Sequence, residues 1–596
     1  MTQRGCQSVG IDLGTTYSSL AYVDAQGLPR IVSDSGGQAV MPSVVFFDED
    51  DIIVGEMALG QAKLRADRVV QFIKVQMGDM WRQEVAGRVH TPESISAIIL
   101  GQLIKEAEPQ IGPIRSAVVT VPAYFTEKRR RATQQAGEIA GLEVIGTLNE
   151  PMAATLAYGL HRLDRQQQVV VYDLGGGTFD VTVVRISPGA LEELATTGNR
   201  QLGGRDWDQA LIDFVADDFQ KAQGSDVRDL PQAMQDLQLE CEQAKRRLGR
   251  MGQTSIRLHA DGRDHRVDVT REKFEQLTAH LLGATKLTTE TAIAEAGLQW
   301  SQISRVVLVG GATHMPCVRR MLEQISGKPP DTGVNPVLAV ALGAAVYAHM
   351  LETGQARKLI RQRQGDQPPA ERTAFELGAD APSLPPTETV PLVRFVTAHG
   401  VGVKVRSGDR WTNKVLIPKN TQVPAKVTRR FLTKATGSGG TQIKIDITQG
   451  DTPDLAAVEE LGTGRLEGLP PGEPDGQPVD VTMEFDQQGR LHIHALYVPR
   501  KQQMEMSLEI PGGLKPEEVE DHRRFLEMTG FLEPLSAKEL LEDLENAESI
   551  DSIPSGPIDR VFSLEELYRA LGAEFDDHQK GEDRPDDDLP MIEPVD

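Results

Sequence analysis

Two short segments of the chain place an aspartate before glycines and threonines in the same order. Gly10–Ser18 reads GIDLGTTYS and Tyr172–Val181 reads YDLGGGTFDV. Glycine lets backbone N–H groups approach phosphate oxygens closely, and threonine hydroxyls add hydrogen-bond donors. One Gly-rich turn alone is more often only a flexible turn, but two copies with the same plan predict a site for phosphate groups. The expected phosphate contacts are Gly14, Thr15, Thr16, Gly175, Gly176, Gly177 and Thr178.

Asp12 and Asp173 each stand two residues before the first glycine, where a strand is expected to end. Two carboxylates facing a triphosphate repel it unless a divalent cation lies between them, which implies Mg²⁺. No G-x-x-x-x-G-K-[ST] segment occurs, so the phosphate site is not a P-loop.

The elements around these segments alternate between strands and helices over residues 7–350. Short apolar runs predict strands at 117–121, 169–172 and 305–309, and helical periodicity covers 127–140 and 277–295. This pattern predicts an α/β region, and the repeated Asp-Leu-Gly unit predicts two related lobes that face each other across a cleft.

The composition excludes several classes of protein. The 596 residues carry a net charge of -24, which disfavours binding to nucleic acid. Cys6, Cys241 and Cys317 are scattered without ligand spacing, so neither a disulfide framework nor a zinc site is indicated. The N-terminus has no signal-peptide h-region and no run of 18 apolar residues occurs, so we expect a cytoplasmic protein with no membrane contact.

The second half of the chain changes character. Residues 351–390 are rich in proline and predict an extended linker. Residues 391–513 contain strictly alternating runs at 442–447, 479–485 and 491–495, which predict an all-β module. Short helical patterns at 515–528, 536–548 and 564–571 fall within a segment at 514–575. The acidic tail at 576–596 is expected to be disordered.

Six motifs in family order resemble the seventy-kilodalton heat-shock chaperones. They are Gly10–Ser18, Thr120–Phe125 (TVPAYF), Asn149–Leu160 (NEPMAATLAYGL), Val171–Val181 (VYDLGGGTFDV), Leu202–Asp208 (LGGRDWD) and Val307–Pro316 (VLVGGATHMP). The resemblance implies an actin-like two-lobed ATPase domain at residues 1–350 that binds ATP, ADP and Mg²⁺. It also implies a β-sandwich at 391–513 that holds extended apolar segments of unfolded polypeptides.

The resemblance also implies a role for individual residues. Asp12 and Asp173 would organise hydrated Mg²⁺, and Lys74 matches the catalytic lysine that holds the attacking water. Glu150 would orient water or metal, and Thr178 would contact the γ-phosphate.

Further roles follow from the same motifs. Pro122 resembles the proline that relays nucleotide state between domains. Glu242, Lys245 and Arg246 resemble an adenosine-contacting helix, although a solvated charge run would look the same. The remaining residues expected at the nucleotide are Gly203, Gly204, Gly310, Gly311 and His314.

Three residues on the expected base side depart from the family pattern. His314 stands where an arginine is usual, Gly249 where a serine hydroxyl usually contacts adenine, and Val337 where an aspartate is usual. They put adenine affinity and selectivity in question but not the phosphate chemistry. The segment between Lys74 and Pro122 is also shorter than usual, so one peripheral subdomain is expected to be trimmed.

In the β-module, Val401, Phe431, Ile443 and Ile445 match the family's apolar peptide cleft, although each could equally belong to the sandwich core. No long helical lid is recognisable after residue 528. A J-domain co-chaperone and a nucleotide exchange factor are the expected partners. The final MIEPVD resembles an acidic partner-binding tetrapeptide, with Pro594 as a departure, but a solvated acidic tail is the favoured explanation.

Two other functions fit parts of the sequence. A small-molecule kinase could use the same fold, but the peptide-module motifs and VGGATHMP argue against it. A nucleotide-regulated scaffold with little or no hydrolysis would explain the altered base side, while Lys74, Glu150 and Thr178 argue for an ATPase.

Overall fold

The structure is a computed structural model of the chain. It describes residues 7–532 except 50, 63–64, 160–165, 332, 334, 354–391, 408–409, 434–442, 467–475, 487–490, 501 and 506–512. The linker expected at 351–390, the helices expected at 536–548 and 564–571, and the acidic tail therefore lie largely or wholly outside the described residues.

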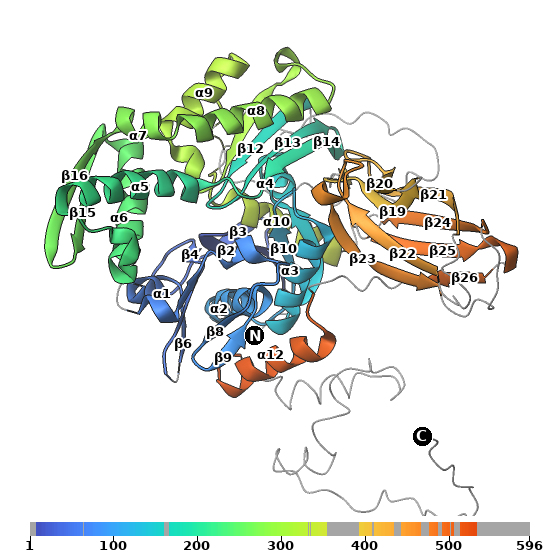
Figure 1. Cartoon of the computed structure of the whole chain (residues 1–596), viewed down its shortest axis with the longest axis horizontal. Coiled ribbons are helices and arrows are strands. Elements are labelled where there is room, and N and C mark those ends of the chain that lie inside the picture. The colour runs from blue at the N-terminus through green and yellow to red at the C-terminus, as the bar shows by residue number, and fades with distance from the viewer. Residues whose placement is uncertain are drawn as a thin grey trace, which may run out of the picture. The chain divides into compact units, whose positions relative to one another are not determined.

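The first lobe is built on one mixed sheet in the order β11-β10-β1-β2-β3, with β4 paired to β2 (Figure 1). Its strands are β1 (Gln7–Asp12), β2 (Tyr17–Val23), β3 (Pro29–Val32), β4 (Met41–Pro42), β10 (Ile114–Val121) and β11 (Glu143–Asn149). The central strand β1 runs parallel to β10 and antiparallel to β2. Its apolar side chains Val9 and Ile11 are fully buried, which leaves Asp12 at the open end of the strand.

The second lobe repeats this arrangement. Its sheet order is β17-β12-β13-β14-β18, and β12 runs parallel to β17 and antiparallel to β13. The strands are β12 (Gln167–Leu174), β13 (Phe179–Ser187), β14 (Ala190–Asn199), β17 (Arg305–Val309) and β18 (Leu392–Arg394). The predicted strands at 117–121, 169–172 and 305–309 are confirmed, as is the duplication of the Asp-bearing strand and its hairpin.

Two helices pack closely between the lobes' sheets. α10 (Ala339–Glu352) lies against β1 and against α4 (Glu150–Gly159). Glycine makes both approaches possible, because a Cβ on Gly10 would lie 1.9 Å from the Ala345 nitrogen and one on Gly343 would lie 1.7 Å from the Ala153 oxygen. α4 begins at Glu150, so this packing also fixes the first residue of the helix at the cleft.

The outer part of the first lobe carries the segment that contains Lys74. It consists of β5 (Val44–Phe47), β6 (Ile52–Val54), β7 (Val69–Gln71), β8 (Gln83–Val85), β9 (Arg88–His90), α1 (Glu56–Gln61) and α2 (Pro92–Ile111). α3 (Glu127–Ile139) contacts α2 and packs on β10 and β11 of the main sheet. A 3₁₀ turn at Ile73–Gln76 presents Lys74. α2 starts with a capping box in which Thr91 and Ser94 each accept the other's backbone N–H. The predicted helix at 127–140 is confirmed as α3.

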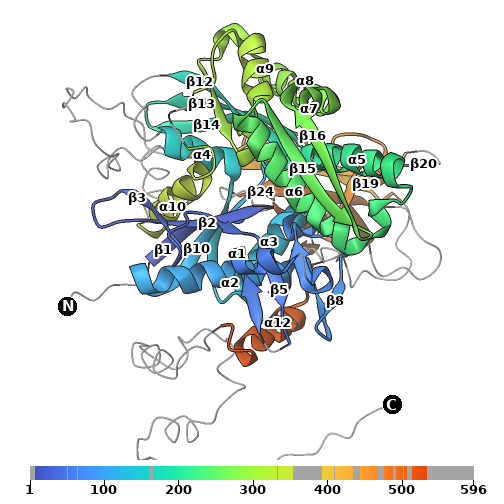
Figure 2. The ribbon, with the colours of Figure 1, turned by 90° about the vertical axis from the view of Figure 1, so that its left-hand side faces the viewer.

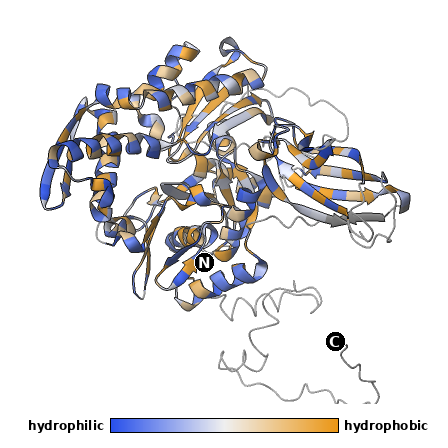
Figure 3. Ribbon diagram, viewed as in Figure 1, coloured by the Kyte–Doolittle hydropathy of each residue, from blue (hydrophilic) through white to orange (hydrophobic). Residues whose placement is uncertain are grey.

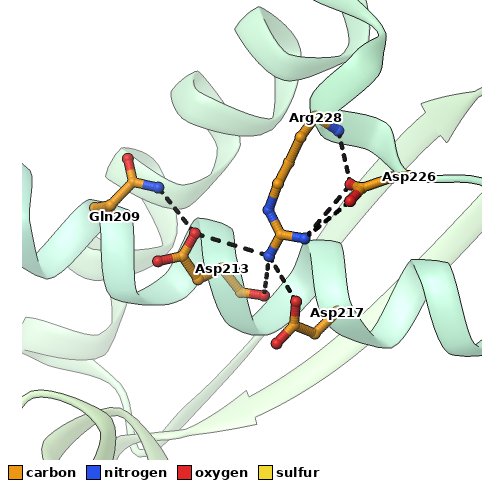
Figure 4. A network of polar contacts seen from close by, with 5 residues as sticks. All are labelled: Gln209, Asp213, Asp217, Asp226 and Arg228. Atoms are coloured by element: carbon orange, nitrogen blue, oxygen red, sulfur yellow. Dashed lines mark hydrogen bonds and ion pairs between the residues drawn. The ribbon is translucent and has the colours of Figure 1, made fainter.

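The outer part of the second lobe shares one apolar core with a face of that lobe's sheet, in which Trp207 and Phe219 pack with residues of β12, β13 and β17. It contains α5 (Gly204–Gln223), α6 (Pro231–Arg250), α7 (Arg271–Leu277), α8 (Ala279–Glu295), α9 (Pro316–Ser326), β15 (Gln253–Ala260) and β16 (Arg263–Thr270) (Figure 2). Arg228 joins α5 to the turn before α6, because its guanidinium contacts Asp217 at 2.6 Å and Asp226 at 3.2 Å (Figure 4).

Residues 401–505 form the predicted sandwich. One sheet has the order β20-β19-β22-β23 and the other β21-β24-β25-β26. The strands are β19 (Val401–Ser407), β20 (Arg410–Ile417), β21 (Ala425–Leu432), β22 (Ile443–Gln449), β23 (Glu459–Leu466), β24 (Pro478–Phe485), β25 (Leu491–Tyr497) and β26 (Gln502–Glu505). Every second residue of β24 is buried, and apolar and polar residues alternate visibly along these strands (Figure 3).

Two segments join the sandwich to the ATPase lobes. β18 pairs in parallel with β14, so Leu392–Arg394 belong to the second lobe's sheet rather than to the sandwich. After the sandwich, α12 (Pro516–Met528) contacts α3 of the first lobe. Gln135 of α3 donates to the Leu514 carbonyl at 2.6 Å and accepts the Leu514 N–H at 3.2 Å, while Arg88 pairs with Asp521 at 2.6 Å.

Candidate functional site

The two phosphate turns meet face to face. The backbone of Gly176 lies so close to Thr16 that a Cβ at this glycine would fall 1.9 Å from the threonine hydroxyl. Gly310 lies close to the end of β12, the strand that carries Asp173, because a Cβ there would lie 2.3 Å from the Leu174 oxygen. Its φ of 82° also favours glycine. A larger residue at Gly310 would require the backbone to move, whereas one at Gly176 would displace the Thr16 side chain.

A cleft of about 990 Å³ opens between the lobes at these turns. Most of the predicted nucleotide and catalytic residues line it: Asp12, Gly14, Thr15, Thr16, Lys74, Glu150, Asp173, Gly175, Gly176, Thr178, Gly204, Glu242, Lys245, Arg246, Gly310, Gly311 and His314. Gly249 and Val337 also line it. Gly177 lies outside this lining, and Gly203 packs against Gly176 and Gly177 behind it.

Lys74 and Glu150 form a buried ion pair at the phosphate end of the cleft. The Lys74 ammonium donates to Glu150 Oε1, and the two residues are only 4% and 8% exposed. The lysine comes from the 3₁₀ turn of the first lobe and the glutamate from the start of α4. A fixed cation in a site shielded from water can stabilise charge that develops on a transferring phosphoryl group.

Three aspartates surround this ion pair. Burial, and then the charge of Glu150, raise the pKa of Asp12 to about 7 and the pKa of Asp180 to about 8. The same causes hold the pKa of Asp173 well above its usual range. A cation that enters the cleft would stabilise the ionised form of these three buried carboxyl groups and lower their pKa values.

No three Asp, Glu, His or Cys side chains within the described ranges lie close enough to hold a metal ion directly. Asp12 and Asp173 nevertheless face the same cleft, and carboxylate oxygens suit a hard cation such as Mg²⁺. The geometry fits a cation that keeps most of its water ligands and meets the protein through them.

Pro122 stands between the site and the sandwich. Next to it, Ala123 donates its N–H to Asp180 at 3.0 Å, and Arg130 donates to the Ala123 carbonyl at 3.2 Å and to Asn149 at 2.8 Å. Asn149 directly precedes Glu150. Tyr124, which follows Ala123, contacts His399 in the segment that leads into the sandwich. The Pro122 turn is thus bonded to the carboxylates on one side and in contact with the second module on the other.

The base side of the cleft is formed by α6 and the turn after β17. Arg246 donates to Glu242 and to the Tyr17 hydroxyl, both at 2.5 Å. Lys245 is held by Asp208 at 2.6 Å and by the Gly204 carbonyl at 2.8 Å. Burial lowers the pKa of His314, so its imidazole is neutral at pH 7.

Sequence reasoning left several lining residues unassigned. Tyr17, Val40, Arg247, Arg250 and Met251 line the cleft, and Asp180 sits behind it. Tyr17 and Asp180 lie inside motifs that were recognised, so a closer reading of GIDLGTTYS and GGGTFDV could have found them. Arg247 and Arg250 continue the helix expected to contact adenosine and Met251 caps its end, so its helical spacing could have pointed to them, whereas only tertiary packing brings Val40 to the cleft.

The four residues expected at the peptide cleft lie in the sandwich core region. Val401 is 0% exposed and Ile445 is 9% exposed, and both belong to the core cluster. Phe431 and Ile443 are partly exposed and pack against that cluster. In this structure only these last two offer surface to a ligand.

The described architecture and site agree with a sequence comparison. The family model described as Hsp70 protein matches residues 8–87, 80–361 and 387–593. This chain belongs to the Hsp70 family. The match covers both ATPase lobes and the sandwich, so the predicted actin-like α/β ATPase domain followed by a β-sandwich is confirmed.

Curated Hsp70 relatives match over most of their length. The chain is 36% identical to the chaperone protein DnaK of Thermotoga neapolitana over 574 residues, which are 95% of this chain and 89% of the relative. It is 37% identical to DnaK of Thermosipho africanus over 496 residues (82% and 77%) and 35% identical to DnaK of Thermotoga maritima over 584 residues (94% and 92%).

Membership of the Hsp70 family makes the chain an ATP-dependent chaperone and an ATPase that binds ATP and ADP. It implies unfolded polypeptides as substrates. The match to residues 387–593 excludes a small-molecule kinase, which has no such module. No helix within the described part of the chain is long and apolar enough to cross a membrane.

Proposed function

We propose that this Hsp70 protein hydrolyses Mg²⁺-ATP with Lys74 and Glu150 as its central residues and uses the cycle to bind and release extended apolar polypeptide segments. The buried Lys74–Glu150 ion pair between two facing phosphate turns carries this proposal. A lysine held by a carboxylate cannot swing to solvent, so its charge stays where the γ-phosphate would lie.

Asp12 and Asp173 would hold hydrated Mg²⁺ through its water ligands. The cation supplies charge that balances the β- and γ-phosphates. Thr15 and Thr178, one from each phosphate turn, would donate to phosphate oxygens, and Thr178 would contact the γ-phosphate. The nearby glycines would present backbone N–H groups to the remaining oxygens.

Adenosine would lie between α6 and the Gly310–His314 turn. Glu242 and Arg246 bond to each other at the cleft surface, where they can reach a ribose or a base. Lys245 already bonds to Asp208 and Gly204, so we expect it to position α6 against α5 more than to contact the nucleotide.

Peptide would bind to the sandwich at a surface that includes Phe431 and Ile443 and reaches Val401 and Ile445 when the strands separate. Nucleotide state would reach this surface through Pro122. We further propose a J-domain co-chaperone and an exchange factor as partners, and a cytoplasmic site of action.

Single-turnover hydrolysis of ATP, with and without Mg²⁺, tests the central claim. We expect slow hydrolysis that requires the cation. Binding of ATP without any hydrolysis in the presence of Mg²⁺ would contradict the roles given to Lys74 and Glu150.

A further inference from the structure

A second cavity of about 270 Å³ lies beside the nucleotide cleft. Thr16, Gly176, Glu242 and Lys245 line both spaces, so the close contact of Thr16 with Gly176 forms part of the wall between them. We call this second space the side chamber. A water takes about 30 Å³ in the liquid, so the side chamber can hold a phosphate ion and several waters.

One contact between the lobes forms part of the lining of the side chamber. The Arg205 guanidinium, at the start of α5 in the second lobe, lies over the Phe72 ring of the first lobe at 4.1 Å from its centroid. Phe72 directly precedes the turn that carries Lys74 and has the unusual φ of 59°. A bulky residue held in the left-handed region indicates that the surrounding structure fixes its position.

Two cations, Arg205 and Lys245, and three carboxylates line the side chamber. Each of its carboxylates is already engaged: Asp208 pairs with Lys245, Glu242 bonds to Arg246, and Asp206 accepts the Gly203 N–H at 2.7 Å. The Arg205 guanidinium makes no ion pair of 4.0 Å or less with the described residues; it lies over the Phe72 ring, and the charges of Asp206 and Asp208 nearby favour its charged form. Of the two lining cations, Lys245 is thus held in an ion pair, whereas the Arg205 guanidinium makes no direct ion pair and can reach an anion in the chamber.

With adenosine bound at α6 as proposed above, hydrolysis would leave orthophosphate beside Lys74 and ADP on the base side of the cleft. The side chamber begins at Gly176 and Gly177 of the second phosphate turn and at Val75, next to Lys74. We propose that orthophosphate leaves through the side chamber, where Arg205 binds it transiently, and that the Phe72–Arg205 contact gates this exit. The proposal rests on the ATPase function proposed above.

Two variants test the two parts of the proposal. Phe72→Ala opens the gate and keeps the cation, with Phe72→Leu as the control that keeps an apolar side chain of similar bulk. Arg205→Gln removes the cation and keeps a polar side chain. Tyr17→Phe removes a different contact between the lobes, the one between the Tyr17 hydroxyl and Arg246 on the base side.

Three rates are measured in each full-length protein during a single turnover: hydrolysis by chemical quench, phosphate release with a fluorescent phosphate sensor, and release of fluorescent ADP. A cation–π contact of about 0.5–1 kcal/mol corresponds to about a two- to fivefold change. Phe72→Ala should accelerate phosphate release by this factor with ADP release unchanged, and Tyr17→Phe should accelerate ADP release instead. Equal acceleration of both products by Phe72→Ala would show a simple latch between the lobes and overturn the exit.

Orthophosphate is also titrated into the ADP complex by calorimetry, a measurement that does not depend on hydrolysis. Arg205→Gln should weaken this binding several-fold, whereas Phe72→Leu should leave it unchanged. Unchanged orthophosphate binding in Arg205→Gln overturns the anion site. Absence of hydrolysis in the wild-type protein would instead contradict the proposed ATPase roles, so the two failures are distinguishable.

Discussion

The imidazole Nε2 of His399 donates to the carbonyl oxygen of Tyr124 at 3.1 Å, and the two rings lie 4.1 Å apart between centroids. This contact joins the segment leading into the sandwich to the turn that contains Pro122. The same turn reaches Asp180 through the Ala123 N–H. Two adjacent residues, Ala123 and Tyr124, therefore contact the Asp180 carboxylate behind the cleft and the segment leading into the sandwich.

His399 gives this contact a pH dependence. Burial lowers the pKa of His399 to about 4, so the folded protein binds fewer protons there than the unfolded chain between pH 6.5 and 4. Titration of His399 does not change the free energy of unfolding above pH 6.5. As the pH is lowered from 6.5 towards 4, it decreases this free energy by up to about 1.4 kcal/mol per pH unit. The unfolding midpoint of His399→Gln, measured by calorimetry, should therefore rise relative to that of the wild-type protein as the pH is lowered.

Glu193 provides the opposite control at the same interface. It accepts the Val396 N–H at 3.2 Å, and burial raises its pKa to about 7. A raised carboxyl pKa costs stability as the pH rises from 4.5 to 7. The unfolding midpoint of Glu193→Gln should thus rise relative to that of the wild-type protein as the pH is raised, which is the reverse of the trend expected for His399→Gln. The same trend in both variants would show that these groups do not titrate as their burial requires.

Lys74→Ala should slow single-turnover ATP hydrolysis by about a hundredfold or more while ATP still binds. The loss of one preorganised group that stabilises transition-state charge typically costs about 3 kcal/mol. Lys286→Ala, a lysine on the exposed part of α8 whose side chain is 47% exposed, is the matched control and should hydrolyse at the wild-type rate. A Lys74→Ala protein as fast as this control would refute the role of Lys74.

Discrimination between ATP and GTP should be weak, within about tenfold. His314 is neutral because burial lowers its pKa, and Gly249 offers no hydroxyl to the base. One lost hydrogen bond is worth about 0.5–1.5 kcal/mol. Calorimetric titration measures both affinities, and His314→Arg should raise the affinity for ATP several-fold. A preference of a thousandfold for ATP in the wild-type protein would contradict this reading of the base side.

A fluorescent apolar peptide should dissociate from the protein within seconds in every nucleotide state. α12 ends at Met528, and its Asp521 pairs with Arg88 of the first lobe. That helix therefore packs on the ATPase domain in this structure. Deletion of residues 530–596 should leave the dissociation rate unchanged, and slow release from the ADP state that disappears on deletion would show that those residues close the groove.

Saturating peptide should raise steady-state ATP turnover less than about twofold, a change of about 0.4 kcal/mol. β18 does pair with β14, and the Leu392 N–H donates to the Gly189 carbonyl at 2.9 Å. Pro391, just before it, has no N–H to extend this pairing, and a Pro-rich stretch precedes it. Deleting residues 355–388 should increase the response, whereas a strong response in the intact chain would show that this stretch does not uncouple the domains.

The sequence by itself determined the parts of this protein that depend on local geometry. A strand, a tight glycine turn and a returning strand are contiguous in the chain, so the turn that brings Asp12, Gly14 and Thr15 to the cleft could be predicted from their spacing alone. The period of two along β24 likewise follows from the pleat of a single strand.

Only the tertiary structure decided which distant residues meet. Lys74 and Glu150 are 76 residues apart, and their pairing depends on how the 3₁₀ turn and α4 pack around the cleft. Packing also decides three locations that the motifs did not predict. Gly177 lies outside the cleft lining, and Val401 and Ile445 lie in the sandwich core. Leu392–Arg394 pair with the sheet of the second ATPase lobe. Burial and strand pairing between remote segments are set by the free energy of the whole fold, which no short motif encodes.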